Sequence, residues 1–413
     1  MARSPVIGRR RGLSLALLVP VLFAAACGGG KSEKTTAGQA ASKVVKIGVI
    51  APLSGDLTAV GTGIRNSVEL AIKQANAANT VPGWKIELAA EDDAAKPDVG
   101  AQAASKLSSD AAVVGVVGTY NSSVALQVAP ILERANIVEI SPANTNDTLT
   151  RGENFKTAPA RPHKNYFRVA TLDSLQGGFA ADYAYQELGA KNVVIIHDKK
   201  AYGQGLAESF KSRFEGDGGK VATVETINPG DKDFSAVLSK IKPMKPDMIF
   251  YGGEYPEASL ISSQAHGAQA MTAPIMGGDG IVDPTYGKTG GTGVENDLGT
   301  SVGAPPEQLD SAKSFIADYK AAGYKDGYSA YGALAYDAAN AIIRTLPAAL
   351  GTAKAVDDTV RMGVIDAVAK TSFAGASGQV AFDEFGDTVT KTLTMYKVQG
   401  GEFKPIKTGE FKG

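Results

Sequence analysis

The sequence has almost none of the residues that build disulfides or metal centres. Cys27 is its only cysteine, and its three histidines, His163, His197 and His266, lie far apart. One cysteine cannot form an internal disulfide, and separated histidines do not have the spacing of metal ligands. Because Cys27 lies in an N-terminal leader and no Gly-x-Ser-x-Gly elbow is present, the sequence argues against a nucleophilic enzyme. We expect no catalytic residue, no metal and no cofactor.

The N-terminal region also lacks an apolar run long enough to cross a membrane. Its apolar stretch, residues 13–23, is well short of the roughly 20 residues that a membrane helix needs. Three arginines at positions 9–11 precede the stretch, and three alanines lead from it to Cys27. This order is typical of a secretory signal. We predict that residues 1–27 are a lipoprotein signal peptide with Cys27 as the lipid anchor. The alternative is ordinary cleavage that leaves a free thiol.

An excess of basic charge is absent once the leader is removed. Residues 1–26 contain four arginines and no acid, so 38 of the 42 basic residues remain against 43 acidic ones, a net charge of −5. Nucleic-acid binding relies on a basic surface, so we expect none. Residues 28–43 have the small, polar composition of a flexible tether. The lipid anchor would be the only membrane contact, on the outer face of the cytoplasmic membrane.

Strand and helix patterns alternate from residue 44 onward. Residues 44–51 are nearly all apolar, as in a parallel strand covered on both faces. Ile64, Val68 and Ile72 recur every four residues, as in an amphipathic helix. The alternation continues to residue 276 and predicts an α/β fold with doubly wound parallel sheets. Because about 370 residues exceed the usual size of one hydrophobic core, we expect two lobes.

The last third departs from this alternation. It has three helical patterns, at residues 311–322, 331–345 and 356–371, followed by two strand patterns, at residues 379–382 and 392–398. A helical block here suggests that the chain returns to the first lobe, so that several crossovers form a hinge. We predict one lobe from residues 44–172 and 303–378, and a second from residues 173–302 and 379–413. Ligands bind beyond the carboxyl ends of strands in open α/β sheets, which makes the cleft between the lobes the expected site.

Two sequence segments carry groups that suit the two ends of an amino acid. Ser122 and Ser123 follow a predicted strand and begin a helix, whose free N–H groups and a hydroxyl can hold a carboxylate. Simple helix capping explains these serines equally well. Asp279 ends a strand in a Gly-Gly-Asp-Gly segment and can pair with an ammonium group, although a turn aspartate also fits.

Other residues near predicted strand ends complete the candidate set. Pro142 bends the chain before Ala143 and Thr145, so that the Ala143 carbonyl and the Thr145 hydroxyl can face the cleft. Tyr202 follows the strand that ends at His197 and can lay its ring over a ligand, or merely cover the start of a helix.

Taken in order, these segments resemble the leucine/isoleucine/valine-binding protein family of ABC importers, which has the type I periplasmic-binding fold. The resemblance runs from Lys46 to about Val398. Its firmest anchors are ordinary motifs in a specific order, at residues 47–55, 91–93, 141–145, 172–174, 197–199, 202–203, 232–235 and 251–253. The resemblance implies a substrate-binding protein that closes its lobes on a free amino acid, most simply a branched-chain or aliphatic one. It also implies ABC transporter permease subunits as partners.

The resemblance assigns roles to five positions. Ser122 matches the family serine that holds the ligand's carboxylate, assisted by Thr145 and the backbone near Ala143. Asp279 matches an acidic position that binds the ammonium group, and Tyr202 matches an aromatic residue that contacts the ligand.

Two positions depart from the family pattern and leave the ligand's side chain open. Val60 stands where an aromatic residue often lines the pocket for the ligand's side chain, and Glu254 stands where a ligand-facing tyrosine is expected. Glu254 could therefore attract a cationic or amide-bearing ligand, or simply point into solvent. Binding of urea, a short amide or a polar amino acid is the alternative function, and an exported enzyme acting on amino acids is a third.

Overall fold

The computed structural model describes residues 43–413 and contains two large β-sheets. The predicted leader, Cys27 and the tether up to residue 42 lie outside the described residues. Within residues 43–413, no helix has both the length and the apolar composition needed to cross a membrane. The predicted α/β class is confirmed, because the first sheet is wholly parallel and the second is mostly so.

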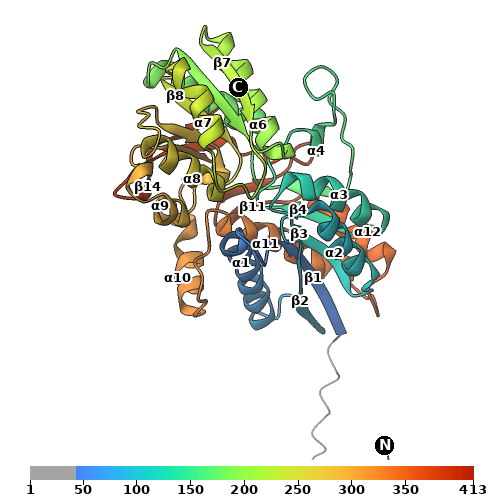
Figure 1. Ribbon diagram of the computed structural model, residues 1–413. Helices are drawn as coiled ribbons and strands as arrows, with labels where there is room; N and C mark the ends of the chain where they lie inside the picture. Colours follow the sequence, from blue (N-terminus) through green and yellow to red (C-terminus); the bar gives the residue numbers. More distant parts are fainter. Residues whose placement is uncertain (1–42) are drawn as a thin grey trace, which may run out of the picture. The chain divides into compact units, whose positions relative to one another are not determined.

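The first sheet has five strands in the order β2-β1-β3-β4-β5. Its strands are β1 (Lys43–Ala51), β2 (Trp84–Asp92), β3 (Val113–Gly118), β4 (Val138–Ser141) and β5 (Tyr166–Arg168). Val114 and Val117 of β3 belong to a core shared with α1 (Thr58–Ala77) and α11 (Gly332–Leu350). Val113 and Val116 belong to a second core with α2 (Pro97–Ser109) and α3 (Ser122–Arg134). Helices therefore cover both faces of this sheet (Figure 1).

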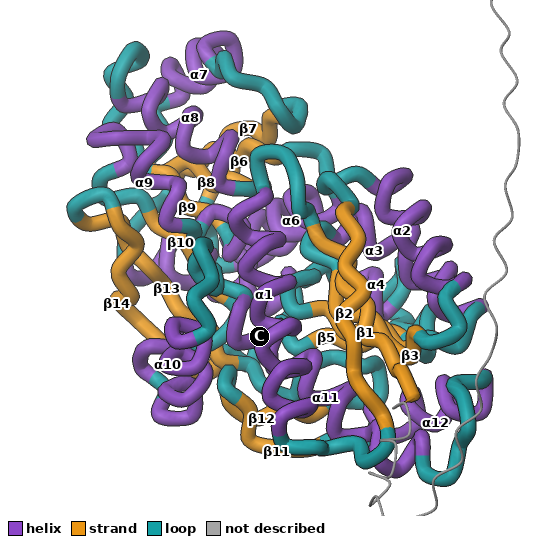
Figure 2. Tube along the Cα trace, turned by 90° about the horizontal axis from the view of Figure 1, so that it is seen from below, coloured by secondary structure: helices purple, strands orange, loops and turns teal. Residues whose placement is uncertain are grey.

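The second sheet has seven strands in the order β14-β13-β10-β9-β8-β6-β7. Five of them are parallel: β6 (Asn192–His197), β7 (Lys220–Thr226), β8 (Met248–Gly252), β9 (Ile275–Gly277) and β10 (Leu298–Ser301). The last two, β13 (Thr392–Gln399) and β14 (Glu402–Glu410), pair antiparallel at one edge, beside β10 (Figure 2). The chain thus returns to this sheet after the helices α11 and α12 (Asp358–Val368).

The remaining elements are shorter. The other α-helices are α4 (Thr148–Arg151), α5 (Asp173–Asp182), α6 (Ala201–Gly216), α7 (Ser235–Ile241), α8 (Tyr255–His266), α9 (Pro284–Gly290) and α10 (Lys313–Ala321). Helix α5 continues as a π-helix, Tyr183–Glu187, and β11 (Ser372–Gly375) pairs with β12 (Gly378–Ala381) as a separate hairpin. Short 3-10 turns occupy Lys242–Met244, Asp279–Ile281, Gly291–Val294, Pro306–Gln308 and Asp310–Ala312.

The alternation predicted from residue 44 to residue 276 is present, with boundaries shifted by a few residues. The sequence pattern missed β10, β11, β14, α4 and α9. Strand β14 is mostly exposed and rich in lysine and glutamate, so it has no apolar alternation to detect. Strand β10 is only four residues long, and α9 contains two glycines. The division of the chain into the two predicted lobes stays a prediction.

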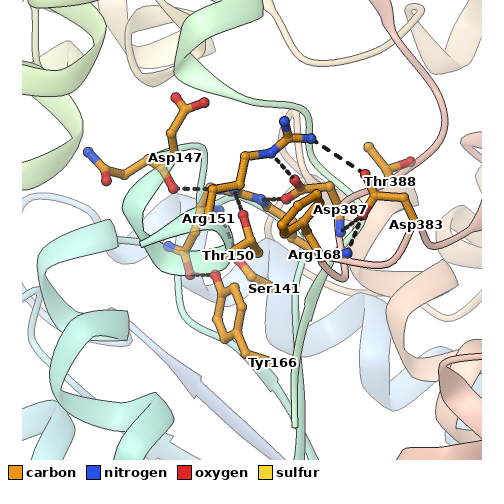
Figure 3. Close-up of polar contacts among 12 residues, drawn as sticks. Ser141, Asp147, Thr150, Arg151, Tyr166, Arg168, Asp383, Asp387 and Thr388 are labelled. Atoms are coloured by element: carbon orange, nitrogen blue, oxygen red, sulfur yellow. Dashed lines mark hydrogen bonds and ion pairs between the residues drawn. The ribbon is translucent and has the colours of Figure 1, made fainter. Parts of the chain in front are cut away.

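A buried arginine ties together three distant segments of the chain. Arg168, at the end of β5, is fully buried and pairs through Nε with Asp387 Oδ1 at 2.7 Å. Its other nitrogens donate to the Asn144 and Asn146 carbonyls, at 3.2 and 2.7 Å, and to the Thr150 hydroxyl. Figure 3 shows Arg168 and Arg151 both reaching the carboxylate of Asp387. Arg168 therefore fixes the loop after β4 to the segment that links β12 to β13.

Asp387→Asn should lower the free energy of unfolding by about 3–5 kcal/mol, because it leaves the buried Arg168 charge without its partner. Burial alone would raise the pKa of Asp387, but Arg168 and Arg151 hold that pKa below the ordinary value of 3.8. Its stabilising contribution is therefore present above pH 3.8 and is lost as the pH falls through the folded-state pKa. Urea unfolding of both proteins between pH 7 and pH 3 should show the difference narrowing in acid.

Asp383→Asn is the matched control, because Asp383 contacts Arg151 at 3.4 Å with a side chain 33% exposed. This change should cost about 1 kcal/mol or less, as partly exposed ion pairs usually do. An equal loss in both variants would contradict the special role of the buried pair.

Candidate ligand-binding site

A small polar cavity lies where the carboxyl ends of strands from both sheets meet. It is lined from the first sheet by residues that follow β3 and β4, and from the second by residues on α6 and after β8 and β9. These residues are Tyr120, Asn121, Ser122, Ala143, Tyr202, Glu254, Asp279, Gly280 and Tyr331. The space in which a water-sized sphere can be centred is about 10 Å³. That is barely room for one water molecule, so the structure is a closed state of the cavity.

Asp279 is a buried carboxylate that hydrogen-bonds only to neutral groups. Its Oδ1 accepts from the Tyr202 hydroxyl at 2.8 Å and from Gln176 Nε2 at 3.0 Å, and its Oδ2 accepts from the Tyr331 hydroxyl at 3.0 Å. Within residues 43–413, no lysine, arginine or histidine pairs with it, and burial raises the pKa of Asp279. A buried anion without a counter-charge favours binding of a cationic group.

The opposite wall presents free donors at the start of α3. Ser122 is the first residue of this 13-residue helix and is 1% exposed. Within the described part of the chain, its hydroxyl and the backbone N–H groups of Ser122 and Ser123 have no hydrogen-bond acceptor. Unpaired N–H groups at a helix N-terminus carry partial positive charge and bind anions. This wall can therefore hold a carboxylate.

Ala143 supplies an acceptor near these donors. Its N–H donates to the Ser141 hydroxyl at 3.1 Å, which turns the loop after β4, and Ala143 itself lines the cavity. Among residues 43–413, no group donates to the Ala143 carbonyl. Asn144, next in the chain, donates to the Tyr120 carbonyl at 2.8 Å and so links this loop to the segment before Ser122.

Three tyrosines form the aromatic part of the cavity wall. The rings of Tyr120 and Tyr331 meet edge to face, with centroids 5.3 Å apart. The Tyr202 hydroxyl accepts from the Gly280 N–H at 3.0 Å while it donates to Asp279. The polar end of Tyr202 is thus fixed, which leaves its ring to contact a ligand.

Glu254 follows β8, is 3% exposed and lies in the cavity wall. The alternative that its side chain points into solvent is therefore wrong. Its Oε1 accepts from Asn121 Nδ2, and its Oε2 pairs with Lys200 Nζ. Burial alone would lower the pKa of Lys200, but the charges of Glu254 and Asp198 raise it above its ordinary value, so Lys200 is protonated at neutral pH. Lys200 thus places a positive charge beside Glu254, which it shares with Asp198 at 3.8 Å.

The structure brings five of the seven predicted site residues to the cavity, namely Ser122, Ala143, Tyr202, Glu254 and Asp279. Ser123 lies just outside it, and its hydroxyl accepts from the Ala201 N–H at 2.9 Å. Thr145 is fully buried beneath the loop, where its carbonyl accepts from the Asp173 N–H at 2.7 Å. Its hydroxyl has no hydrogen-bond partner in the described chain, and Thr145 is not among the cavity-lining residues.

Sequence reasoning missed Tyr120, Asn121 and Tyr331 as cavity residues. Tyr120 and Asn121 directly precede Ser122, so the strand-to-helix junction that drew attention to the serines also contained them. Tyr331 comes from the last third of the chain, 52 residues after its partner Asp279. Its only local signal is an aromatic residue just before a helix.

A cavity between the carboxyl ends of two doubly wound sheets, with an anion on one wall and helix N–H groups on the other, defines a bilobal solute-binding protein. Residues 44–402 match the sequence model of the family described as periplasmic binding protein. The chain belongs to this family, and the resemblance to its leucine/isoleucine/valine-binding members is confirmed. It is a substrate-binding protein of the ABC-transporter type.

Two kinds of relatives support this placement. Leu/Ile/Val-binding protein homolog 3 of Brucella melitensis is 32% identical over 395 residues, which cover 94% of this chain and 99% of the relative. The structure of the leucine-binding protein LivK from Thermotoga maritima is 33% identical, with a TM-score of 0.77, and covers 88% of this chain and 98% of that one. LivJ from Streptococcus pneumoniae, solved with isoleucine, is 29% identical with a TM-score of 0.78, over 89% and 100% of the two chains.

More distant members share the fold alone. A solute-binding protein from R. palustris, solved with benzoate, is 22% identical with a TM-score of 0.77 and covers 89% of this chain and 97% of that one. The fold therefore accommodates ligands without an ammonium group, and the choice of ligand has to be argued from the cavity walls.

Proposed function

We propose that the protein is the substrate-binding component of an ABC importer that captures a free amino acid, with leucine, isoleucine or valine as the expected ligand. The observation that carries the proposal is the pairing of two opposite walls. Asp279 is a buried anion without a cation, and the start of α3 offers N–H groups without an acceptor. The ammonium and carboxylate of an amino acid would complete both walls, with Ser122 and Ala143 as further polar contacts.

Capture requires the cavity to open, because its present space of about 10 Å³ cannot hold an amino acid. In the proposed cycle the lobes separate, the first lobe binds the ligand through Ser122 and Ala143, and closure brings Tyr202 and Asp279 onto it. Hinge closure of this kind is an established motion in periplasmic binding proteins. Thr145 would act indirectly, by holding the loop that carries Ala143.

The contacts of Glu254 favour an aliphatic ligand over a cationic one. Glu254 is the acid that suggested a cationic or amide ligand. Its Oε1 accepts a hydrogen bond from Asn121, and its Oε2 pairs with Lys200. A ligand cation would have to displace Lys200. Urea, short amides and polar amino acids remain the competing hypothesis, and an exported enzyme is disfavoured because the named relatives are binding proteins.

Export and anchoring are the remaining parts of the proposal. Cleavage before Cys27 and lipidation of its thiol would leave the tether and the binding unit on the outer face of the cytoplasmic membrane, next to the permease subunits that receive the ligand. This part rests on the charge, apolar stretch and small residues of the leader.

Isothermal titration of refolded, ligand-stripped protein should show tight one-to-one binding of leucine, isoleucine or valine. The comparison ligands are arginine, glutamate, GABA and urea. Arginine tests whether a cationic side chain can bind beside Glu254. GABA tests the distance that the site requires between the ligand's ammonium and carboxylate groups. Binding of arginine or urea alone would overturn the aliphatic assignment and keep the site. No heat of binding with any of these ligands would overturn the proposed ligand class.

Asp279→Ala should weaken amino-acid binding by roughly 2–5 kcal/mol, because the ligand's ammonium group would lose a buried partner. Since the pKa of Asp279 is raised above 3.8 by burial, affinity should also fall as the pH drops toward that pKa and protonates the carboxylate. Titrations from pH 8 to pH 4 measure both effects. Asp366→Ala, an exposed acid on α12, is the control and should change neither. Unchanged affinity in Asp279→Ala would remove this residue from the site.

Cys27→Ser should move the protein from the membrane fraction to the soluble fraction, because serine has no thiol for the thioether lipid. Cell fractionation followed by intact-mass measurement of the parent protein tests this, with the lipid mass expected on a chain that begins at Cys27. A soluble parent protein with a free thiol would contradict the anchor and leave the binding function untouched.

A further inference from the structure

Glu254 lies in the cavity wall, and its hydrogen-bonding partners are side chains of the protein itself. Its carboxylate accepts from Asn121, which precedes Ser122 on the first-sheet side, and from Lys200, which precedes α6 on the second-sheet side. Lys200 also lies 3.8 Å from Asp198 Oδ2. The Asn121–Glu254 hydrogen bond therefore joins the two sides of the cavity, and the cation that balances it comes from the same side as Glu254.

A second group of contacts lies immediately beside this bond. The Ser123 hydroxyl accepts from the Ala201 N–H at 2.9 Å, and Asn146 Nδ2 donates to the Ala201 carbonyl at 2.7 Å. Ala201 follows Lys200, and Ser123 lies two residues after Asn121. Cross-cavity bonds therefore flank Ser122 on both sides, while the Ser122 hydroxyl itself is left without an acceptor in the described chain.

All of these bonds are made by the protein with itself. The donor and the acceptor of each bond belong to residues on opposite sides of the cavity, so the bonds hold these two sides together. The Asn121 side chain makes no capping bond to its own helix, and its bond to Glu254 is its only hydrogen bond among residues 43–413. A charge-assisted hydrogen bond between buried groups is stronger than a neutral one.

We propose that Glu254 is a positioning residue, held by Lys200, which acts through Asn121 as a latch for the closed state and does not select the ligand's side chain. The latch adds the same closing free energy whichever ligand is bound. With a ligand bound the cavity is wider than in this structure but keeps the Asn121–Glu254 bond, so breaking that bond lowers the population of closed states and weakens every ligand by one common factor. A residue that contacts the side chain would instead change the ratio of affinities.

The test is Glu254→Gln, which keeps the size of the side chain and removes the charge that pairs with Lys200. Two measurements are made on the full chain carrying Cys27→Ser. The first is the distance between labels at introduced cysteines, Gln102→Cys on α2 and Glu215→Cys on α6, both exposed and free of side-chain hydrogen bonds in the described chain. Without other cysteines in the sequence, the labels report only these two positions. The second is affinity for leucine, isoleucine and valine.

The latch predicts a shift of the ligand-free distance toward the open state and a common loss of affinity of about 10- to 100-fold, with the order of the three ligands unchanged. Asn121→Ala should produce the same shift in distance and the same common loss of affinity. It replaces Glu254→Gln in the test if that variant does not fold. Lys232→Gln removes an exposed ion pair with Asp56, at 3.0 Å and with side chains 59% and 64% exposed, which joins the loop after β7 to the loop after β1 outside the cavity lining. As the matched control it should change affinity by less than about twofold.

Two results would overturn the latch. One is a changed order of affinities with an unchanged ligand-free distance, which would place Glu254 on the ligand. The other is no change in either measurement. The affinity measurement rests on the proposed function, whereas the distance measurement does not. If none of the three amino acids binds the parent protein, a shifted distance in Glu254→Gln still supports the latch, and only the ligand assignment fails.

Discussion

The buried ion pair of Arg168 and Asp387 is the interaction on which the arrangement of the site depends. A fully buried guanidinium needs an anion and acceptors for its N–H groups, and it finds them in three segments: the loop after β4, helix α4 and the link between β12 and β13. Asp147 in the same loop also accepts from the Ser174 N–H and hydroxyl, at 3.0 and 2.6 Å, near the start of α5. Two buried charges, those of Arg168 and Asp147, thus fix the loop that carries Ala143 to two of the connections between the sheets.

The cavity uses buried charge in two different ways. Glu254 is paired with Lys200, whereas Asp279 has only neutral donors around it and gains from a cationic partner. The first arrangement suits a contact that forms in every closing event. The second suits a position that is completed by a ligand. This difference in charge balance separates two acids that look equivalent in the sequence.

Sequence patterns were sufficient to predict the fold class and most of the cavity residues. They were insufficient for residues whose contact partners lie far away in the sequence. The strand-to-helix junction at Ser122 and the Gly-rich segment at Asp279 were visible because strand ends in parallel sheets meet at one edge. The place of Tyr331 in the cavity could not be predicted in this way, because its contact with Asp279 depends on where α11 packs. The hydroxyls of Ser123 and Thr145 were expected in the site, but neighbouring backbone at Ala201 and burial below the loop determine their positions.

The order of strands has a consequence for when the protein can acquire its structure. The last two strands, β13 and β14, add to the sheet whose earlier members end at Ser301, and α11, near the end of the chain, covers the sheet that begins at Lys43. Neither sheet can complete its core while the C-terminal third is still being synthesised. Such long-range contacts slow folding, because loops must close before the contacts form. A chain of this topology therefore stays without a finished core on either sheet until its last strands and helices have been made.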